Sequence, residues 1–420
     1  MIADAPAGPD TSLTSELGAG SSVGSIRTGL DRLLADSGRL RGRRYGLLAH
    51  HASVTADLRP AHVALAASEG GAPAVLFGPE HGYYGVEQDM VPSEDQRDPW
   101  TGVPIRSLYG HSEQTLRPDA EAFAGLDLLL VDLQDVGSRY YTYAATATWA
   151  AEEALAAGCE VWVLDRPNPL GGAVVEGNLR QPGFESFVGA FAHPVRHGLT
   201  LGEIVRLEIA RDAGAGGAGD PSGLEIWRLD GWRRSMLWPE TGRPWIAPSP
   251  NMPTFATALV YPGLCLLEGT RVSEGRGTTR PFNVFGAPWL HPVELARGLA
   301  TRDIPGVSFL PMYFRPQFQK HAGAVCGGVE VVVGDAAVLP AYRTGVEVLE
   351  ALFELSRGEA FWRAESYEFV RDRPAVDLLA GSDALRRGLE SGAGCGEWRA
   401  TWAADEAAFR QRRAGCLLYD

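Results

Sequence analysis

Lysine is almost missing from this chain of 420 residues, and its scarcity argues against two kinds of chemistry. Lys320 is the single lysine, and the other basic side chains are arginines. A phosphate-binding loop of the Walker type requires a Gly-Lys pair, which does not occur here. A lysine that forms a Schiff base would have to be Lys320, whose sequence context does not favour that role.

The chain also has fewer basic than acidic residues, and it lacks long apolar runs. The formal net charge is −14 at pH 7, and the isoelectric point is near 5.2. Such a surface repels phosphate backbones, so nucleic acid is not expected as a partner. No apolar run approaches the length of a membrane span, so no membrane-spanning segment is predicted.

Cysteine is scarce and scattered. The five cysteines show no C-x-x-C spacing, which argues against a disulfide framework and a structural zinc site. Cys159 and Cys265 lie within apolar runs and are predicted to be buried packing residues. The N-terminus has neither the basic nor the apolar region of a signal peptide. We therefore expect a reducing, cytoplasmic setting, with secretion by another route left open.

Four apolar runs in the first half of the chain each end on polar, ionisable residues. Helix-like stretches such as residues 143–157 follow most of them, an order typical of parallel strands in a βα-repeating sheet. Ligands bind beyond the carboxyl ends of such strands, so the polar residues are expected to converge on one rim. The runs and their polar ends are 45–49 with His50 and His51, 74–78 with Glu80 and His81, 126–131 with Asp132 and Asp135, and 160–164 with Asp165 and Arg166.

The length of the chain and a change of pattern near residue 262 predict two domains. Residues 1–25, rich in Gly, Ser and Ala, are predicted to be a disordered tail. Residues 26–262 are predicted to form an α/β domain around the parallel sheet, and residues 263–420 a smaller α+β domain. Further elements are expected as helices at 27–37, 291–300, 341–356 and 398–413, strands at 224–229, 307–313 and 328–333, and a surface loop at 213–223.

The sharpest catalytic candidate is the motif Gly78-Pro79-Glu80-His81-Gly82. Two glycines and a proline fix a tight turn directly after a predicted strand, with a carboxylate at its tip. A catalytic acid needs such a defined position, and a neighbouring histidine can orient it or share its proton. On the motif alone, the alternative is a turn whose glutamate caps the next element.

Two other strand ends carry residues that suit a sugar-sized pocket. Near Asp132 and Asp135, aromatic and basic residues at 139–141 could line it by stacking and hydrogen bonding. The alternative makes Asp135 a helix N-cap and places the tyrosines in the core. For Asp165 and Arg166, a structural ion pair is the simpler single role.

A glycine-rich segment at 268–281 packs two carboxylates, three arginines and four hydroxyl groups together. A solvated, flexible loop is the ordinary explanation, but stiff, apolar neighbours on both sides favour an anchored loop. Arg276 and Arg280 would suit a substrate that bears a carboxylate, because guanidinium pairs with carboxylate bidentately. The G-x-G in this loop lacks the third glycine and the preceding strand of a dinucleotide-binding site.

A series of ordered motifs resembles the exo-β-N-acetylmuramidase family, the NamZ-type peptidoglycan glycosidases, over roughly residues 40–420. The resemblance implies a Rossmann-like catalytic domain joined to a C-terminal auxiliary domain, with the active site in the cleft between them. It further implies release of terminal N-acetylmuramic acid from the non-reducing end of peptidoglycan fragments. The motifs are FGPEHG (77–82), DLQDVGSRYYTY (132–143), LDRPNPLGG (164–172), PVRHGLTLGE (194–203), PSPNMPT (248–254), YPG (261–263) and EGTRVSEGRGTTRPF (268–282).

The chain departs from this family at two places. His50-His51 stands where an Asn-containing turn is expected, and Arg271-Val272 stands where an Asn-Leu pair is usual. The first departure could alter the rim of the pocket.

Residues and resemblance together predict a glycoside hydrolase without a cofactor, acting on a peptidoglycan-derived saccharide or muropeptide. Glycoside cleavage generally needs two carboxyl groups. Glu80, assisted by His81, is the expected general acid, and Glu274, then Glu268, then Asp132 and Asp135 are candidates for the second carboxylate. Arg276 or Arg280 is expected to pair with the lactyl carboxylate of muramic acid. Other candidate substrate contacts are Arg139, Tyr140, Tyr141, Asp165, Arg166, Asn168, His197, Asn251 and Thr278.

Two alternatives of different classes stay open at this point. One is a metal-dependent hydrolase that uses the histidines at 50, 51 and 81 with Asp132 and Asp135, although no H-x-x-x-H spacing supports it. The other is a non-catalytic muropeptide-binding protein. The choice between a retaining and an inverting reaction depends on the separation of the carboxylates, which the sequence does not give.

Overall fold

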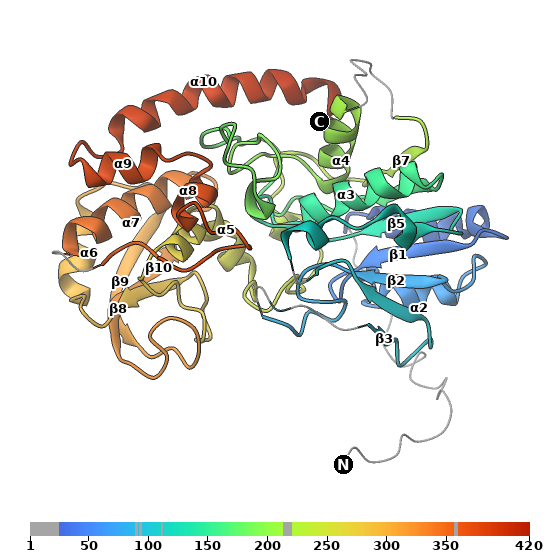
Figure 1. Ribbon diagram of the computed structural model, residues 1–420, viewed down its shortest axis with the longest axis horizontal. Coiled ribbons are helices and arrows are strands. Elements are labelled where there is room, and N and C mark those ends of the chain that lie inside the picture. The colour runs from blue at the N-terminus through green and yellow to red at the C-terminus, as the bar shows by residue number, and fades with distance from the viewer. Residues whose placement is uncertain (1–24, 89–90, 92–94, 111, 213–220, 357–359) are drawn as a thin grey trace, which may run out of the picture.

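The computed structural model describes residues 25–88, 91, 95–110, 112–212, 221–356 and 360–420. Two domains lie side by side, and a long C-terminal helix runs across the top of both (Figure 1). Except for residue 25, the tail predicted at 1–25 lies outside the described residues, as does most of the loop predicted at 213–223. In the described part of the chain, no helix is long and apolar enough to cross a membrane.

The first domain is built on a seven-stranded sheet whose strands are parallel except for β3, which pairs antiparallel with β4. Strands β2, β3 and β4 lie on one side of β1, and β5, β6 and β7 lie on its other side. The direction in which strands are added therefore reverses between β1 and β5. The spatial order is β3-β4-β2-β1-β5-β6-β7. The strands are β1 (Tyr45–Ala49), β2 (Val75–Gly78), β3 (Gln96–Arg97), β4 (Pro104–Ser107), β5 (Leu128–Asp132), β6 (Glu160–Leu164) and β7 (Leu224–Trp227).

Helices cover both faces of this sheet, which explains the apolar runs in its strands. Along β5, Leu128 and Leu130 pack into the core that contains α1 (Gly29–Ala35) and α2 (Ala61–Ala66). Leu129 and Val131 point the other way, into the core that contains α3 (Tyr143–Ala156) and α4 (Leu201–Asp212). A central parallel strand is buried on both faces, so its sequence is continuously apolar.

The second domain packs helices on an antiparallel sheet of order β8-β10-β9. Its first helix, α5, crosses α7 at Gly263, where an added Cβ would lie 2.1 Å from the carbonyl oxygen of Ala341, so only glycine fits. The elements are β8 (Val284–Ala287), β9 (Val307–Phe314), β10 (Cys326–Val333), α5 (Phe255–Leu264), α6 (Pro292–Ala300), α7 (Ala341–Leu355), α8 (Ala375–Ala380), α9 (Ala384–Glu390) and α10 (Gly396–Arg413). The 3-10 helices of the chain are Ser37–Leu40, Glu113–Leu116, Ala120–Phe123, Phe187–Gly189, Trp238–Thr241, Cys265–Gly269 and Ala414–Cys416.

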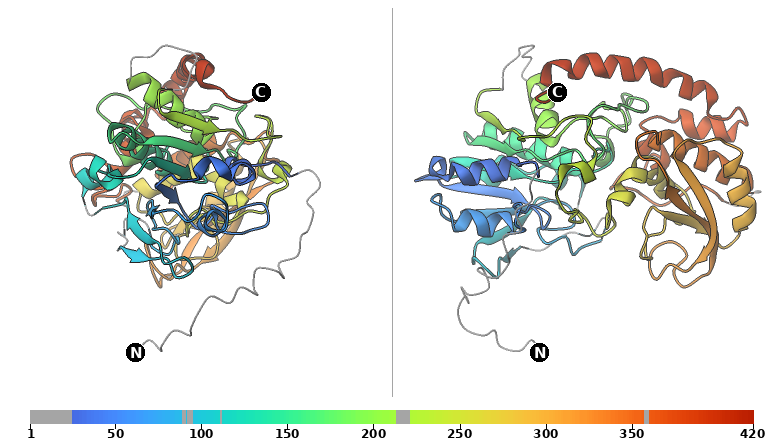
Figure 2. Two further views of the ribbon diagram at one scale, coloured as in Figure 1. Left: turned by 90° about the vertical axis from the view of Figure 1, so that its right-hand side faces the viewer. Right: turned by 180° about the vertical axis from the view of Figure 1, so that it is seen from behind.

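The end of the chain returns to the first domain, as the view from behind also shows (Figure 2). At the end of α10, Arg413 donates to the carbonyl oxygens of Gly172, His197 and Gly198. The hydroxyl of Tyr419 donates to Asp165 at the end of β6. The second domain is therefore joined to the first at both of its ends.

The predicted fold class is confirmed: a mostly parallel α/β sheet domain is followed by a smaller α+β domain. The predicted strands at 45–49 and 160–164 match β1 and β6, and Cys159 and Cys265 are buried as predicted. Helix α5 was not predicted because several prolines, the last of them Pro253, precede it and Pro262 lies inside it, so the segment resembles a series of turns. The predicted boundary at residue 262 falls within this helix.

Candidate active site

A pocket lined by residues of both domains lies between them. We call it the interdomain pocket. It brings together seven of the residues singled out from the sequence: Glu80, His81, Tyr140, Tyr141, Asn251, Glu268 and Arg276. Nine further residues complete its lining: Thr142, Tyr143, Val188, Ser249, Met252, Tyr261, Phe282, Tyr367 and Glu368.

The tight turn after β2 places Glu80 in this pocket. An added Cβ on Gly78 would lie 2.6 Å from the backbone nitrogen of Tyr83, so glycine is needed where the chain folds back. The backbone nitrogen of Gly82 donates to the carbonyl oxygen of Pro79 at 3.0 Å, and His81 takes a left-handed φ of 70°. The turn leaves the Glu80 side chain 5 % exposed, at the wall of the pocket.

A hydroxyl group and the backbone hold the two polar side chains of this turn. The Thr142 hydroxyl, at the start of α3, donates to Oε2 of Glu80 at 2.7 Å. His81 Nδ1 lies 3.0 Å from the carbonyl oxygen of Glu87, and a proton on Nδ1 makes it the donor. Glu80 is thus a buried carboxyl group with a neutral hydrogen-bond partner, an arrangement that suits an acid that must give up a proton and regain it.

The second domain contributes an ion pair to the opposite wall. Arg276 Nη1 lies 2.9 Å from Oε1 of Glu268, and the Tyr367 hydroxyl donates to Oε2 of Glu268 at 2.6 Å. The guanidinium of Arg276 stacks over the ring of Phe282, 5.2 Å from its centroid. Both oxygens of Glu268 are therefore engaged, and Glu268 holds Arg276 in position.

Glu274, the first candidate from the sequence for the second carboxylate, is not among the pocket residues. Its Oε2 pairs with Nζ of Lys320 at 2.8 Å, and Lys320 also donates to the carbonyl oxygens of Leu267 and Val272. Burial disfavours the charged form of Glu274, but Lys320 and Arg276 attract the charge, and the net effect lowers the pKa of Glu274. Glu274 and the single lysine together hold the loop that carries Glu268 and Arg276.

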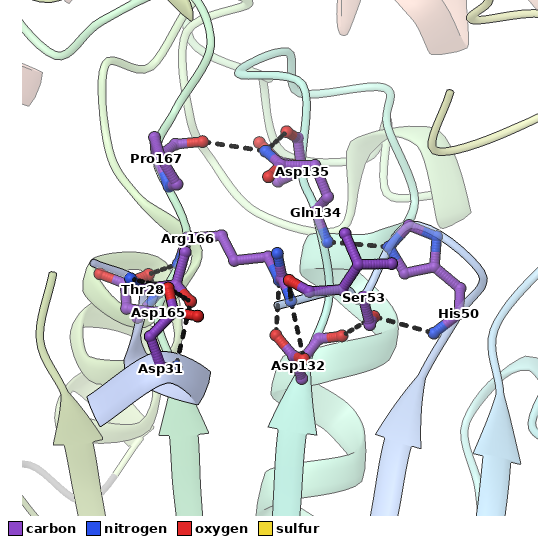
Figure 3. Close-up of polar contacts among 12 residues, drawn as sticks. Thr28, Asp31, His50, Ser53, Asp132, Gln134, Asp135, Asp165, Arg166 and Pro167 are labelled. Atoms are coloured by element: carbon purple, nitrogen blue, oxygen red, sulfur yellow. Dashed lines mark hydrogen bonds and ion pairs between the residues drawn. The ribbon is translucent and has the colours of Figure 1, made fainter. Parts of the chain in front are cut away.

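Four residues at the strand ends form what we call the strand-end network: His50, Asp132, Asp165 and Arg166 (Figure 3). Arg166 reaches across to Asp132 and binds it bidentately, with Nε 2.5 Å from Oδ1 and Nη2 2.9 Å from Oδ2. Asp132 and Arg166 are buried and not among the pocket residues. The sequence analysis considered Asp165 and Arg166 as substrate contacts or as a structural ion pair. In the structure Arg166 does form a buried ion pair, but its partner is Asp132 and not Asp165.

The other two members of the network also make internal contacts. His50 Nε2 accepts from the backbone nitrogen of Gln134 at 3.0 Å, so Nδ1 carries the proton and donates to the carbonyl oxygen of Pro248. Burial, reinforced by nearby positive charge, lowers the pKa of His50 well below its usual value and keeps the ring neutral. Asp165 accepts from the Thr200 hydroxyl and the Gly202 backbone nitrogen, so it anchors local structure.

Asp135 and His197, both predicted to contact substrate, lie in the protein interior instead. Oδ2 of Asp135 accepts from the backbone nitrogen of Gly137 at 2.6 Å, and burial raises the pKa of Asp135 to about 7. Nε2 of His197 lies 3.8 Å from the same oxygen. His197 Nδ1 accepts from the backbone nitrogen of Leu199, which fixes the ring.

Four more predicted contacts serve the structure rather than the pocket. Asn168 bonds the backbone of residues 170 and 199, and Arg139 donates to the carbonyl oxygens of residues 178, 193 and 379, which ties the domains together. Thr278 donates to the carbonyl oxygen of residue 275. Arg280 lies on the surface in an ion pair with Glu330. Of the arginines considered from the sequence, Arg276 is the one that lines the pocket.

Two of the candidate ligands for a metal ion, His50 and Asp132, are likewise committed to other partners. The lone pair on His50 Nε2 accepts from Gln134, and Asp132 is bound by Arg166. Among the residues that the structure describes, no three His, Cys, Asp or Glu side chains gather in a way that could hold a metal ion.

Tyr367 and Glu368 are the polar pocket residues that sequence reasoning missed entirely. They belong to a tight turn in which residues 367 and 370 exchange two backbone hydrogen bonds. Glu368 and Phe369 take left-handed φ values of 48° and 66°. Turns of this type favour Asn-Gly, so Glu-Phe gave no turn signal, and each strained residue costs on the order of 1–3 kcal/mol.

Comparison with known proteins gives one consistent relationship over the whole fold. Residues 45–256 match the family described as "Exo-beta-N-acetylmuramidase NamZ, N-terminal", and residues 259–419 match its C-terminal counterpart. The chain is 38% identical over 371 residues to the "Peptidoglycan beta-N-acetylmuramidase NamZ" of Bacillus subtilis (strain 168), covering 87% of this chain and 85% of that protein.

Two solved structures share the fold. A DUF1343 family protein (BF0371) from Bacteroides fragilis NCTC 9343 superposes with a TM-score of 0.83 at 30% identity, covering 95% of this chain and 100% of that one. A second DUF1343 family protein (BF0379) from the same organism gives a TM-score of 0.72 at 26% identity, covering 94% of this chain and 99% of that one.

Proposed function

The chain belongs to the exo-β-N-acetylmuramidase NamZ family, and from that premise we propose how its interdomain pocket works. The protein is a glycoside hydrolase that releases N-acetylmuramic acid from the non-reducing end of peptidoglycan fragments. The observation that carries the mechanism is the position of Glu80. This buried carboxyl group of the first domain lines the same pocket as Arg276 of the second domain.

Glu80 is the general acid of this proposal. It transfers its proton to the glycosidic oxygen as the bond from that oxygen to C1 breaks, and the electron pair of the bond leaves with the oxygen. The Thr142 hydroxyl donates to Oε2 of Glu80 and holds the carboxyl group at the wall of the pocket. His81 keeps the turn in place through its contact with the backbone at Glu87.

Arg276 is the proposed partner of the lactyl carboxylate, the group that distinguishes muramic acid from N-acetylglucosamine. Its position is fixed from two sides, by the ion pair with Glu268 and by the ring of Phe282. A guanidinium held in this way recognises a carboxylate with little loss of side-chain freedom. Arg280 cannot share this role because it lies on the surface with Glu330.

A chromogenic β-glycoside of N-acetylmuramic acid tests the proposal, with product identity checked by mass spectrometry. The protein should release free N-acetylmuramic acid, and it should not act on a substrate whose terminal 4-hydroxyl group carries another sugar. The N-acetylglucosamine analogue should be cleaved poorly. A correctly folded protein without turnover, or one that cleaves inside a capped chain, would contradict the proposed function.

A further inference from the structure

The turn that carries Tyr367 and Glu368 is strained, and both domains hold it. Backbone hydrogen bonds join Tyr367 N to Val370 O at 3.2 Å and Val370 N to Tyr367 O at 2.9 Å. Between them, Glu368 and Phe369 occupy the left-handed region, which side chains of this size rarely adopt. Such strain persists only where the surroundings impose it, and it is concentrated at functional sites.

Aromatic packing from the first domain stabilises the turn. The ring of Tyr109 lies 6.4 Å from that of Phe369 and 5.8 Å from that of Phe187, measured between centroids. The Tyr109 hydroxyl lies 3.5 Å from Oε2 of Glu368, at the limit of a hydrogen bond. Glu368 is thus carried on the second domain, lies against residues of the first, and lines the interdomain pocket.

Three glutamates line the pocket: Glu80, Glu268 and Glu368. Glu80 supplies the proton in the proposed function. Glu268 has Arg276 on one oxygen and the Tyr367 hydroxyl on the other, so it is committed to positioning Arg276. Glu274, the candidate from the sequence, pairs with Lys320 outside the pocket.

We propose that Glu368 is a further catalytic residue, the second carboxylate, which acts at the anomeric carbon while Glu80 acts at the glycosidic oxygen. This inference rests on the proposed function and deepens it. When Glu80 gives its proton to the leaving oxygen, the electron pair of the broken bond leaves with that oxygen and C1 becomes electron-deficient. The negative charge of Glu368 stabilises C1 at that stage.

Two balanced routes complete the reaction from there. In one, a Glu368 oxygen bonds to C1, and a water molecule then displaces it while Glu80 takes the proton of that water. In the other, Glu368 takes a proton from water as the water oxygen bonds to C1, and exchange with solvent restores both carboxyl groups. Proton NMR of the first-formed anomer distinguishes the routes, since the first retains the configuration and the second inverts it.

The test compares Glu368→Gln with Glu80→Gln on two muramic acid glycosides, one with a nitrophenyl leaving group and one with a sugar. Glu368→Gln should lower kcat by about two to four orders of magnitude on both, because both need charge at C1 stabilised. In kcat/KM, which reports the cleavage step, Glu80→Gln should lose as much on the sugar but far less on the nitrophenyl substrate, because that leaving group needs little protonation. A Glu368→Gln protein within about ten-fold of wild type on both substrates, or impaired on the sugar alone, would overturn the assignment.

A second variant separates chemistry from folding. Asn tolerates the left-handed conformation better than Glu, so Glu368→Asn should leave the thermal midpoint unchanged or raise it while removing activity. The inhibition constant of free N-acetylmuramic acid should change by less than about ten-fold, because ground-state binding is largely kept. Glu368→Asn that retains turnover, or that loses activity only in proportion to lost folding or lost binding, would contradict a catalytic role.

Glu365→Gln is the matched control, since Glu365 is an exposed glutamate three positions earlier in the same segment. It should behave as the wild type. The proposed function and this inference fail differently. A folded wild-type protein without turnover contradicts the function, whereas an active wild type beside an equally active Glu368→Gln contradicts the inference alone.

Discussion

The strand-end network and the interdomain pocket contain the same kinds of residue in opposite circumstances. In the network, Arg166 holds Asp132 by two bonds, and both ring nitrogens of His50 have backbone partners. In the pocket, Glu80 accepts from the hydroxyl group of Thr142. A bidentate ion pair commits both oxygens of Asp132 to Arg166, whereas Glu80 lines a pocket into which a substrate can bind.

This difference also concerns the position where sheets of this kind usually bind ligands. Doubly wound sheets bind ligands where the strand order reverses, which is beyond β1 and β5. Here Arg166, Trp238, Pro244 and Ile246 line a second pocket at that place, and the polar residues of the strand-end network bind one another. The second domain instead closes a pocket over the end of β2, next to that position, and completes it with its own residues.

Breaking the network should produce the largest loss of stability. Arg166→Met leaves Asp132 buried without its cation, which should cost about 3–5 kcal/mol of unfolding free energy. Activity per folded molecule should stay near that of the wild type. Urea unfolding monitored by tryptophan fluorescence gives the first quantity, and turnover at low denaturant gives the second.

The double variant Arg166→Met with Asp132→Leu is the control for this prediction. With both charges removed, no buried charge is left unpaired, so it should be more stable than Arg166→Met alone. Equal destabilisation of the two would show that packing, not charge pairing, holds the strand ends together.

Asp135 should make stability depend on pH. Because burial raises its folded pKa to about 7, the folded state binds the proton more tightly than the unfolded state does. The contribution of Asp135 to the stability of the folded state is complete at pH values below the ordinary pKa of a carboxyl group. It is lost as the pH rises to about 7. Wild type should lose up to about 3 kcal/mol between roughly pH 5 and pH 7 from this group.

Asp135→Asn should remove that part of the slope. Glu203, whose pKa is also raised to about 7 by burial, keeps its share in both proteins, so the difference between them reports Asp135. Guanidinium unfolding of both proteins at a series of pH values checks the prediction. Parallel stability curves over the whole range would contradict it.

Arg276→Ala should have a smaller effect, confined to substrate choice. Loss of a charged hydrogen bond to the lactyl carboxylate should weaken transition-state binding of the muramic substrate by about 1.5–3 kcal/mol. The ratio of kcat/KM for the muramic acid glycoside to kcat/KM for the N-acetylglucosamine glycoside should fall accordingly. Damage to the pocket that affects both substrates equally leaves this ratio unchanged. Arg280→Ala is the control and should leave the ratio unchanged; an unchanged ratio in Arg276→Ala would place the lactyl contact elsewhere.

Sequence reasoning succeeded where neighbours in the chain determine the structure. The buried run of β5 and the glycines around Glu80 reveal their conformation through local sequence alone. It could not exclude Asp132 as a candidate second carboxylate, because the partner of Asp132 is an arginine distant in the chain that only the fold brings close. It missed Glu368 because the central residues of this turn, Glu368 and Phe369, are not the Asn and Gly that usually indicate such a turn in a sequence.

The central claim is that chemistry occurs in the interdomain pocket and that Glu80 supplies the proton. The most direct test is turnover of Glu80→Gln on a muramic acid disaccharide, together with its unfolding curve. We expect a loss of about two to four orders of magnitude in kcat with an unchanged unfolding midpoint, since the amide keeps the shape and removes the proton. Near wild-type turnover by a folded Glu80→Gln protein would contradict the claim.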